Sequence, residues 1–366
     1  MQLIYLSPVP WDSFSQRPHK FVEWFHSVKG KDVLWIEPYP TRFPLLSDLL
    51  RLKTPALAEK RRNPDWIKVM IPNALPIEPL PGSGLLNALL WCEIINEIKK
   101  FSYREPTLLA IGKPSVLALM ILEQLNGVTA LYDAMDDFPA FYSAFSRMAM
   151  KWREYRVINK VTHVLVSSTA LKRRWNRIRS DVQLVPNGLD AGLLPDSGKL
   201  RSKNSNLIFG YVGTLGPWFD WDWIIALACA RPNDLVRLIG PVFVAAPRGS
   251  FPGNIEMLPS CNHDNALRAM QDFNIGLIPF KKNKLTESVD PIKYYEYRAL
   301  GLPVVSTDFG EMSFRSEEEG IFISRSRQDI NQLIEHALLS ETDRNKTRMF
   351  IRSNTWEARF SGAEIC

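Results

Sequence analysis

DPIKYYEYRALGLPVVST, residues 290–307, predicts a loop, a short helix and a buried strand in succession. Asp290 is a good N-cap residue, and Pro291 suits the first helical position because its missing N–H costs nothing there. Gly301 suits the left-handed residue that follows a helix, and Pro303 prevents the helix from continuing. The predicted helix is therefore bounded by favourable residues at both ends.

Two charged residues of this helix indicate a nucleotide ligand. Lys293 and Glu296 are three residues apart and therefore share a face. A lysine in the first turn lies beside unpaired backbone N–H groups, where a diphosphate can bind. A carboxylate one turn later can accept two hydrogen bonds from a ribose diol, each worth roughly 1.5–3 kcal/mol. The alternative is an amphipathic helix with a surface lysine and glutamate.

This segment, together with GLIPF at 276–280, resembles the nucleotide-sugar site of GT-B glycosyltransferases, especially retaining enzymes of the glycosyltransferase 4 type. Those enzymes usually carry two glutamates separated by seven residues. Glu296 matches the second, which binds ribose, whereas Ser288 stands at the position of the first and Glu287 is one residue out of register. The resemblance implies a UDP- or GDP-sugar as donor substrate and no cofactor, and the base and sugar stay open.

Composition is that of an ordinary globular protein, with 366 residues, 46% of them hydrophobic, and a mean hydropathy of −0.13. No apolar run reaches the roughly 18 residues of a membrane-spanning helix. The N-terminus MQLIYLSPVP reads as a first strand, not as a signal peptide. The four cysteines lack CxxC spacing, so neither a zinc site nor a disulfide framework is expected, and they suit a reducing cytoplasm.

Basic residues are concentrated between residues 147 and 179, where ten Lys or Arg accompany one acid, Glu154. This stretch predicts a surface that faces an anionic membrane, at about 1 kcal/mol per basic residue near the bilayer. Nucleic-acid binding is a less favoured alternative, and a pair of solvated helix faces is another. A second stretch, 45–62, is apolar and then basic, and could lie on a membrane surface or form a loop near the cleft.

Short apolar runs alternate with amphipathic stretches, which predicts an α/β fold with parallel sheets. The twelve expected strands are too many for one simple doubly wound sheet. They lie at residues 3–6, 33–36, 67–71, 108–111, 130–132, 163–166, 183–185, 207–212, 236–239, 255–258, 275–278 and 303–306.

The polar stretch between residues 188 and 206 predicts a break between two Rossmann-like domains. Two such domains facing across a cleft match the GT-B architecture. We therefore expect an N-terminal acceptor-binding domain at 1–190 and a C-terminal nucleotide-sugar-binding domain at 205–344. The resemblance also implies a final helix, at about 345–366, that crosses back onto the N-terminal domain.

The second half opens with the glycine loop GYVGTLGPWFDWDW at 210–223. A strand, glycine loop and helix in succession can present backbone N–H groups to phosphate, and Gly213 and Thr214 are the predicted ligands. A tight structural turn is the alternative. No basic pair follows this loop, so Lys293 is expected to supply most of the positive charge, aided by a lysine among residues 281–284.

Asp220 and Asp222 form a DxD pattern just after this loop. Acids in the first turn of a helix are favoured by the helix dipole alone. The pattern is therefore interpreted as helix capping, and no metal site is predicted.

Acidic residues in LYDAMDDF, 131–138, follow an apolar strand. Because strand C-terminal ends in open α/β sheets point into the ligand crevice, Asp133, Asp136 and Asp137 are placed to meet an acceptor hydroxyl. A crowded carboxylate can have a raised pKa and serve as a general base. Asp136 is the predicted catalytic residue and Asp133 a predicted substrate ligand, with helix capping by Asp136 or Asp137 as the alternative.

The loop at 8–21 follows the first strand and is expected to line the acceptor site. There Trp11 could stack on a sugar, Arg17 could bind an acceptor phosphate and His19 could contact substrate, although a structural histidine is the alternative. No GxGxxG and no Ser–His–Asp or Cys–His arrangement supports a dehydrogenase or a hydrolase.

Together these features predict a glycosyltransferase that moves a sugar from a nucleotide-sugar to a glycan or lipid-linked glycan in surface polysaccharide biosynthesis. It is expected in the cytoplasm, peripheral on the inner face of the plasma membrane. Two alternatives stay open. One is a sugar-nucleotide epimerase of the same fold, which needs no acceptor, and the other is a non-catalytic, membrane-associated scaffold.

Overall fold

A computed structural model describes residues 1–43, 63–125, 127–195, 206–247, 251–363 and 365. The chain divides into two compact units, which we call unit 1 (Met1–Val185 with Ala363–Cys366) and unit 2 (Pro186–Gly362). The stretch 45–62, for which the sequence suggests a membrane contact or a loop, lies outside the described residues.

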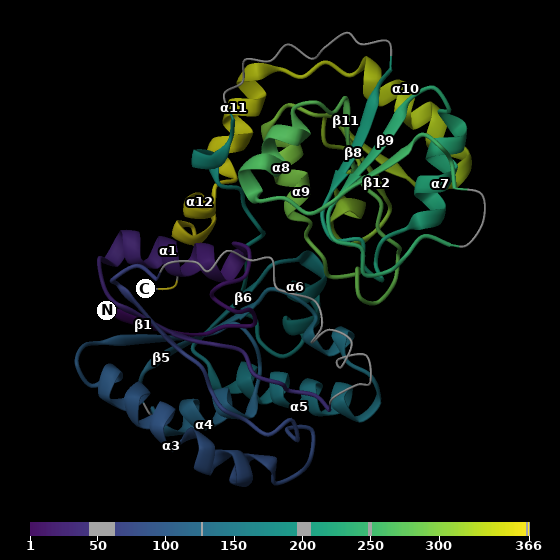
Figure 1. The fold of residues 1–366 in the computed structure, drawn as a ribbon. Coiled ribbons are helices and arrows are strands. Elements are labelled where there is room, and N and C mark those ends of the chain that lie inside the picture. The colour runs from purple at the N-terminus through teal and green to yellow at the C-terminus, as the bar shows by residue number, and fades with distance from the viewer. Residues whose placement is uncertain (44–62, 126, 196–205, 248–250, 364, 366) are drawn as a thin grey trace. The chain divides into compact units, whose positions relative to one another are not determined.

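Unit 1 is built on a parallel sheet that contains seven described strands in the order β3-β2-β1-β4-β5-β6-β7 (Figure 1). The strands are β1 (Gln2–Leu6), β2 (Val33–Ile36), β3 (Ile67–Met70), β4 (Thr107–Ile111), β5 (Thr129–Ala134), β6 (His163–Val166) and β7 (Val182–Leu184). The helices are α1 (Arg17–Lys29), α3 (Ser83–Ser102), α4 (Val116–Gln124), the short η1 (Phe138–Phe141), α5 (Ala144–Lys160) and α6 (Thr169–Trp175).

The central strands of unit 1 are buried on both faces, which explains their continuous apolar sequences. The chain places β2 and β3 on one side of β1, and β4 to β7 on the other. The carboxyl ends of β1 and β4 therefore form a topological switch point, where open α/β sheets bind ligands.

Unit 2 holds a second parallel sheet, with six described strands in the order β10-β9-β8-β11-β12-β13. The strands are β8 (Ile208–Val212), β9 (Leu235–Ile239), β10 (Ile255–Leu258), β11 (Ile275–Ile278), β12 (Val304–Thr307) and β13 (Ile321–Ser324). The helices are η2 (Ala191–Leu193), α7 (Trp221–Ala230), α8 (His263–Met270), α9 (Ile292–Ala299), η3 (Gly310–Phe314), η4 (Arg327–Asp329), α10 (Ile330–Leu339), α11 (Arg344–Ser353) and α12 (Trp356–Ser361).

The twelve strands predicted from sequence all occur, with limits within two residues of those observed. β13 was not predicted; it is a four-residue strand that, among the described strands, pairs with β12 alone and forms the edge of its sheet. An apolar run so short, directly after the charged stretch 317–319, gives little periodic signal.

The two units differ from the predicted domains at both boundaries. Unit 2 begins at Pro186, and it includes α11 and α12, which the sequence analysis assigned to a helix crossing onto the first domain. Leu189 explains this grouping, because its N–H donates to the Asn354 carbonyl at 2.9 Å and its carbonyl accepts from the Trp356 N–H at 3.1 Å. Only Ala363–Cys366 group with unit 1.

In the part of the chain that the structure describes, no helix combines the length and the apolar character needed to cross a bilayer.

Candidate functional site

Helix α9 has an open N-terminus in unit 2. Its N-cap is Pro291, which makes no side-chain capping bond. Among the described residues, nothing accepts a hydrogen bond from the N–H of Ile292 or of Lys293. Both residues are partly exposed, so this end of the helix can receive an anion.

Asp290 does not cap this helix, contrary to the sequence prediction. Its buried carboxylate accepts hydrogen bonds from the Asn187 N–H at 2.7 Å, the Tyr295 hydroxyl at 2.8 Å and the Arg315 guanidinium at 2.8 Å. Arg315 neutralises the charge of the carboxylate in the interior, and the two neutral donors complete its hydrogen bonding. Asp290 therefore anchors the loop before α9 and leaves the helix end open.

Glu296 lies between two cationic or ionisable groups. Lys293 Nζ is 2.5 Å from Glu296 Oε2, and His263 Nε2 is 2.8 Å from Glu296 Oε1. Burial alone would raise the pKa of Glu296, but the charge of Lys293 and the contacts with His263 hold that pKa below its ordinary value. The carboxylate is therefore ionised and oriented at neutral pH.

His263 was missed in the sequence analysis. It is the first residue of α8, directly after the N-cap Asn262, and its side chain is partly exposed. The sequence did indicate that His263 follows the strand β10. Because the carboxyl ends of parallel strands lie at one edge of a sheet, residues just after a strand are candidates for the site.

Ser288, at the position of the missing glutamate, has a buried hydroxyl that makes no hydrogen bond to any described residue. Glu287 is exposed on the surface beside it. The adjacent glutamate therefore does not replace the missing one by turning inward.

The glycine loop after β8 is held by backbone contacts. The Gly213 N–H donates to the Ile239 carbonyl at 2.9 Å, so it is already engaged. Thr214 differs, because neither its N–H nor its hydroxyl bonds to any described residue, whereas its carbonyl accepts from the Tyr211 hydroxyl at 3.1 Å. Thr214 alone keeps the predicted capacity to bind phosphate.

This loop does not lead directly into a helix N-terminus, as the sequence analysis expected. Helix α7 begins at Trp221, and Asp220 caps it by accepting from the Trp223 N–H at 3.1 Å. Asp222 pairs with Arg327 at 2.9 Å. The capping interpretation of the DxD pattern is thus confirmed for Asp220.

The lysines at 281–284 differ in availability. Lys282 forms an ion pair with Asp308 at 2.8 Å, whereas Lys281 and Lys284 are exposed and make no ion pair within the described residues.

Arg17 and Asp133 form a buried ion pair in unit 1. Arg17 Nε lies 2.9 Å and Nη2 lies 2.8 Å from Asp133 Oδ1, and Arg17 Nη1 donates to the Val185 carbonyl at 2.7 Å. Both side chains are at most 1% exposed. This geometry ties α1 to the ends of β5 and β7, which is a structural role, and the predicted contacts with substrate stay predictions.

His19 and Trp11 are buried beside this pair. His19 Nδ1 accepts from the Gln16 N–H at 3.2 Å, so His19 Nε2 carries the proton and donates to the Trp11 carbonyl at 3.1 Å. The Trp11 ring packs against His19 and against Trp35. The structural interpretation of His19 accounts for both of its nitrogens, and the predicted sugar stacking on Trp11 stays a prediction.

Asp136 follows β5 and has the environment expected of a general base. The residue as a whole is partly exposed, and its carboxylate makes no hydrogen bond to the described residues. Burial, with the charges of Asp137 and Asp133 adding to it and that of Arg17 opposing it, raises the pKa of Asp136 to about 7. Neither Asp136 nor Asp137 caps the short helix η1 through its side chain.

Asp137 belongs to a separate network. Arg174 donates to Asp137 at 2.7 Å and to Glu154 at 2.9 Å, and Glu154 also accepts from the Tyr132 hydroxyl at 2.9 Å. Burial raises the pKa of Glu154 to about 7, although Arg174 lowers it. The network fixes α5 and α6 against β5 and so holds the loop that carries Asp136.

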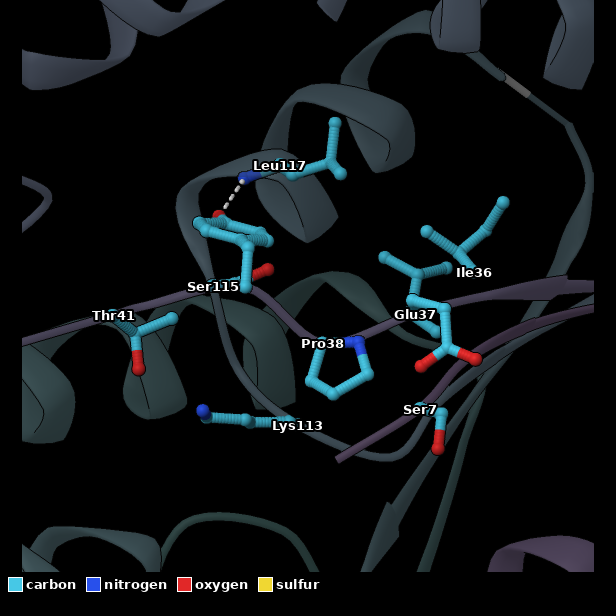
Figure 2. Close-up of a pocket in the computed structure, with 10 residues that line it drawn as sticks. Ser7, Ile36, Glu37, Pro38, Thr41, Lys113, Ser115 and Leu117 are labelled. Carbon is cyan, nitrogen blue, oxygen red and sulfur yellow. Dashed lines mark hydrogen bonds between the residues drawn. The ribbon is translucent and has the colours of Figure 1, made fainter. Parts of the chain in front are cut away.

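A small open hollow of about 20 Å³, room for about one water molecule, lies at the switch point of unit 1, over the ends of β1, β2 and β4 (Figure 2). Lys113 and Thr41 line one side, and Glu37 and Ser7 line the other. Lys113 makes no ion pair within the described residues. None of these four residues was predicted from the sequence, although Glu37 directly follows a predicted strand.

The basic stretch 147–179 is not a patch of ten available cations. Five of its members bind acids: Arg153 pairs with Glu78, Arg156 and Lys160 with Glu123, Arg174 with Asp137 and Glu154, and Arg179 with Asp181. The cations available to a partner are therefore fewer than the sequence suggests.

Solved structures resemble the whole chain. Sucrose-phosphate synthase from Thermosynechococcus elongatus has a TM-score of 0.67 at 14% identity, with 98% of this chain and 96% of that chain covered. HepE of Anabaena in complex with UDP-glucose has a TM-score of 0.60 at 14% identity, with 100% and 95% covered. The chain has the GT-B fold. A third GT-B structure, an Escherichia coli trehalose-6-phosphate protein bound with UDP-2-fluoro glucose, has a TM-score of 0.62 at 10% identity, with 99% and 98% covered.

Sequence comparison adds a curated relative. Over 207 residues the chain is 26% identical to "Putative teichuronic acid biosynthesis glycosyltransferase TuaH" of Bacillus subtilis (strain 168). The match covers 50% of this chain and 51% of the relative, so it spans about half the length of that protein. No protein-family model matches the chain.

Proposed function

We propose that the chain is a glycosyltransferase that moves a sugar from a UDP- or GDP-sugar to a glycan or lipid-linked glycan, in surface polysaccharide biosynthesis. It would work in the cytoplasm at the inner face of the plasma membrane. The observation that carries this proposal is the open N-terminus of α9 with Lys293, Glu296 and His263 beside it, in a GT-B fold.

Unit 2 would take the donor. The ammonium of Lys293 and the N–H groups of Ile292 and Lys293 would hold the diphosphate, with Thr214 as a further donor. Glu296 would accept hydrogen bonds from the ribose diol. Its Oε2 now binds Lys293, so donor binding would transfer Lys293 to the diphosphate while His263 keeps Glu296 in place. Lys293 supplies the positive charge, so the proposal invokes no metal.

Unit 1 would take the acceptor. The acceptor oxygen would attack the anomeric carbon while the bond from that carbon to the diphosphate breaks, and the nucleoside diphosphate would leave with the electron pair. Asp136, with its pKa of about 7, would receive the hydroxyl proton.

The relatives support this choice. The B. subtilis relative is named as a teichuronic acid biosynthesis glycosyltransferase, and two of the similar structures hold UDP-glucose or its fluoro analogue. An epimerase of the same fold stays the second candidate, because it would use the same nucleotide site.

A thermal-shift titration with UDP, GDP, ADP, CMP and dTDP tests the proposal. A nucleotide at about 100 times its dissociation constant stabilises a protein by roughly 2.7 kcal/mol. We expect stabilisation by UDP or GDP, and no stabilisation by any nucleotide would favour a non-catalytic scaffold. NMR of the matching nucleotide-sugar, incubated without acceptor, separates the candidates, since only an epimerase converts it to another sugar.

A further inference from the structure

Helix α5 exposes an aromatic stripe on the side opposite the core. Its members Phe145, Met148, Trp152 and Tyr155 are spaced by three or four residues, so they share one helix face. All four are exposed, Met148 by 67% and Trp152 by 58%. The opposite face of α5 is buried through Met150, Arg153, Glu154, Val157 and Ile158. The Arg156 guanidinium lies 4.7 Å from the centre of the Trp152 ring, and every member of the aromatic stripe stays exposed to solvent.

Basic residues flank the aromatic stripe on both sides. At 100° per residue, Arg147 and Lys151 lie along one edge of it, and Arg156 and Lys160 lie along the other. Lys151 is exposed and makes no ion pair within the described residues. The one acid of α5, Glu154, is buried. Arg156 and Lys160 share the one carboxylate of Glu123, so their edge keeps an excess of one positive charge. The exposed face of α5 is thus apolar along its centre and net cationic at both edges.

Helix α3 adds a second apolar face. Leu85 and Leu89, which are 80% and 78% exposed, lie opposite its buried side, and Leu86 and Leu90, at 57% and 46%, extend this face toward one edge. Helices α3, α4 and α5 cover the same side of the sheet, and α4 contacts both neighbours (Figure 1). The outer faces of α3 and α5 therefore both point away from the sheet.

We propose that this helical layer binds an anionic lipid bilayer, with the aromatic stripe of α5 inserted at the interface and Lys151 beside the headgroups. This pattern of aromatic and leucine side chains bordered by Lys and Arg is that of an interfacial helix. The flanking positive charges favour a bilayer over a second copy of the chain. Anionic headgroups would attract these charges, whereas the same face of a second copy would repel them.

This inference deepens the proposed function and rests on its lipid-linked acceptor. The aromatic stripe begins nine residues after Asp136, and the 3₁₀ helix η1 between them exposes the further aromatic ring of Phe141. In parallel α/β units the helices start at the edge where the strands end. The stripe therefore starts near the loop that carries Asp136, so a bilayer docked there can deliver an acceptor headgroup to that edge.

Vesicle sedimentation of the full chain tests this assignment. The wild-type protein should sediment with vesicles of phosphatidylglycerol and phosphatidylcholine, and much less with phosphatidylcholine alone. Replacing both Phe145 and Trp152 by Ser should weaken partitioning by about tenfold or more, and Lys151→Glu by about fivefold or more. Phe243→Ser, at an exposed phenylalanine of unit 2, and Lys29→Glu, at an exposed lysine of α1, are the matched controls.

Three results would overturn the inference. They are no sedimentation of the wild type, equal sedimentation of the Phe145/Trp152 variant, and a concentration-dependent dimer that this variant abolishes. Unchanged thermal unfolding shows that each variant is folded. Nucleotide binding is measured on the same samples. Nucleotide binding without vesicle binding would refute only the membrane face, whereas vesicle binding without nucleotide binding would refute only the enzymatic proposal.

Discussion

The imidazole of His263 lies 2.8 Å from the carboxylate of Glu296, although 33 residues separate them in the sequence. The two residues belong to α8 and α9, which begin at the same edge of the unit 2 sheet. Their contact, together with that of Lys293, fixes an ionised carboxylate beside an open helix N-terminus. That combination favours a ligand that carries both a diol and a diphosphate.

Lys293→Met should weaken binding of the nucleoside diphosphate by roughly 1.5–3 kcal/mol, because the phosphate loses a charge-assisted contact. Binding of the corresponding nucleoside should change much less, since the methionine keeps the aliphatic stem. Calorimetric titrations of both ligands measure the difference. Lys346→Met, at an exposed ion pair in the same unit, is the control, and equal losses for nucleoside and diphosphate would argue against a phosphate role for Lys293.

Asp136→Asn should abolish most transfer activity, because the amide cannot accept the acceptor proton. In the wild type, kcat/KM should rise with pH through about 7, where the Asp136 carboxyl loses its proton. The pH–rate profile measures this, with Asp272→Asn, at an exposed aspartate of unit 2, as control. A kcat/KM that stays constant from about pH 5 to about pH 9 would contradict the role of Asp136 as the general base.

The same substitution should stabilise the fold at alkaline pH. The pKa of Asp136 is higher in the folded than in the unfolded state, so the folded protein binds more protons between those pKa values and loses stability as pH rises. Asp136→Asn removes this loss. Its unfolding temperature should exceed that of the wild type above pH about 7 and equal it near pH 4, and a deficit at alkaline pH would contradict the assigned pKa.

Asp133→Asn should destabilise unit 1 by about 3–5 kcal/mol, because it leaves the buried Arg17 guanidinium without its counter-charge. Urea unfolding measures the loss. Glu105→Gln breaks the exposed ion pair with Lys31 and should leave the midpoint nearly unchanged. If Asp133→Asn lowers the free energy of unfolding as little as this control does, the structural role of Asp133 is contradicted and the predicted contact with substrate is favoured.

Gly213→Ala should destabilise unit 2, because the added Cβ would lie 2.6 Å from the Tyr211 hydroxyl. The φ of +156° at Gly213 is also uncommon for residues with a side chain. Tyr211→Phe removes the clashing oxygen and should partly restore the unfolding temperature when combined with Gly213→Ala. If the double variant unfolds at the same temperature as Gly213→Ala alone, the destabilisation comes from the backbone conformation and not from the clash with the hydroxyl.

The fold was predictable because each sheet is parallel and buried, so its strands are short apolar runs between longer amphipathic stretches. The shared face of Lys293 and Glu296 was predictable for a different reason, because residues three apart in a helix lie on the same side of it. Gly301 takes the left-handed conformation expected of it, with φ of +67°.

The tertiary partners of the site residues were not predictable. Asp290 has the sequence position of an N-cap, but Arg315 and Tyr295 hold its carboxylate elsewhere. His263 meets Glu296 only because two strands end at the same edge. Local spacing fixes which residues share an element, whereas contacts such as these depend on how separate elements pack.

The affinity of Glu296→Gln for the nucleotide that stabilises the wild type tests the central claim most directly. The substitution keeps the shape of the side chain and removes the charge that the ribose diol and Lys293 bind. Calorimetry should show a loss of roughly 1.5–3 kcal/mol in binding free energy, with Glu335→Gln on α10 unchanged. An affinity equal to that of the wild type would contradict the assignment of α9 as the nucleotide site.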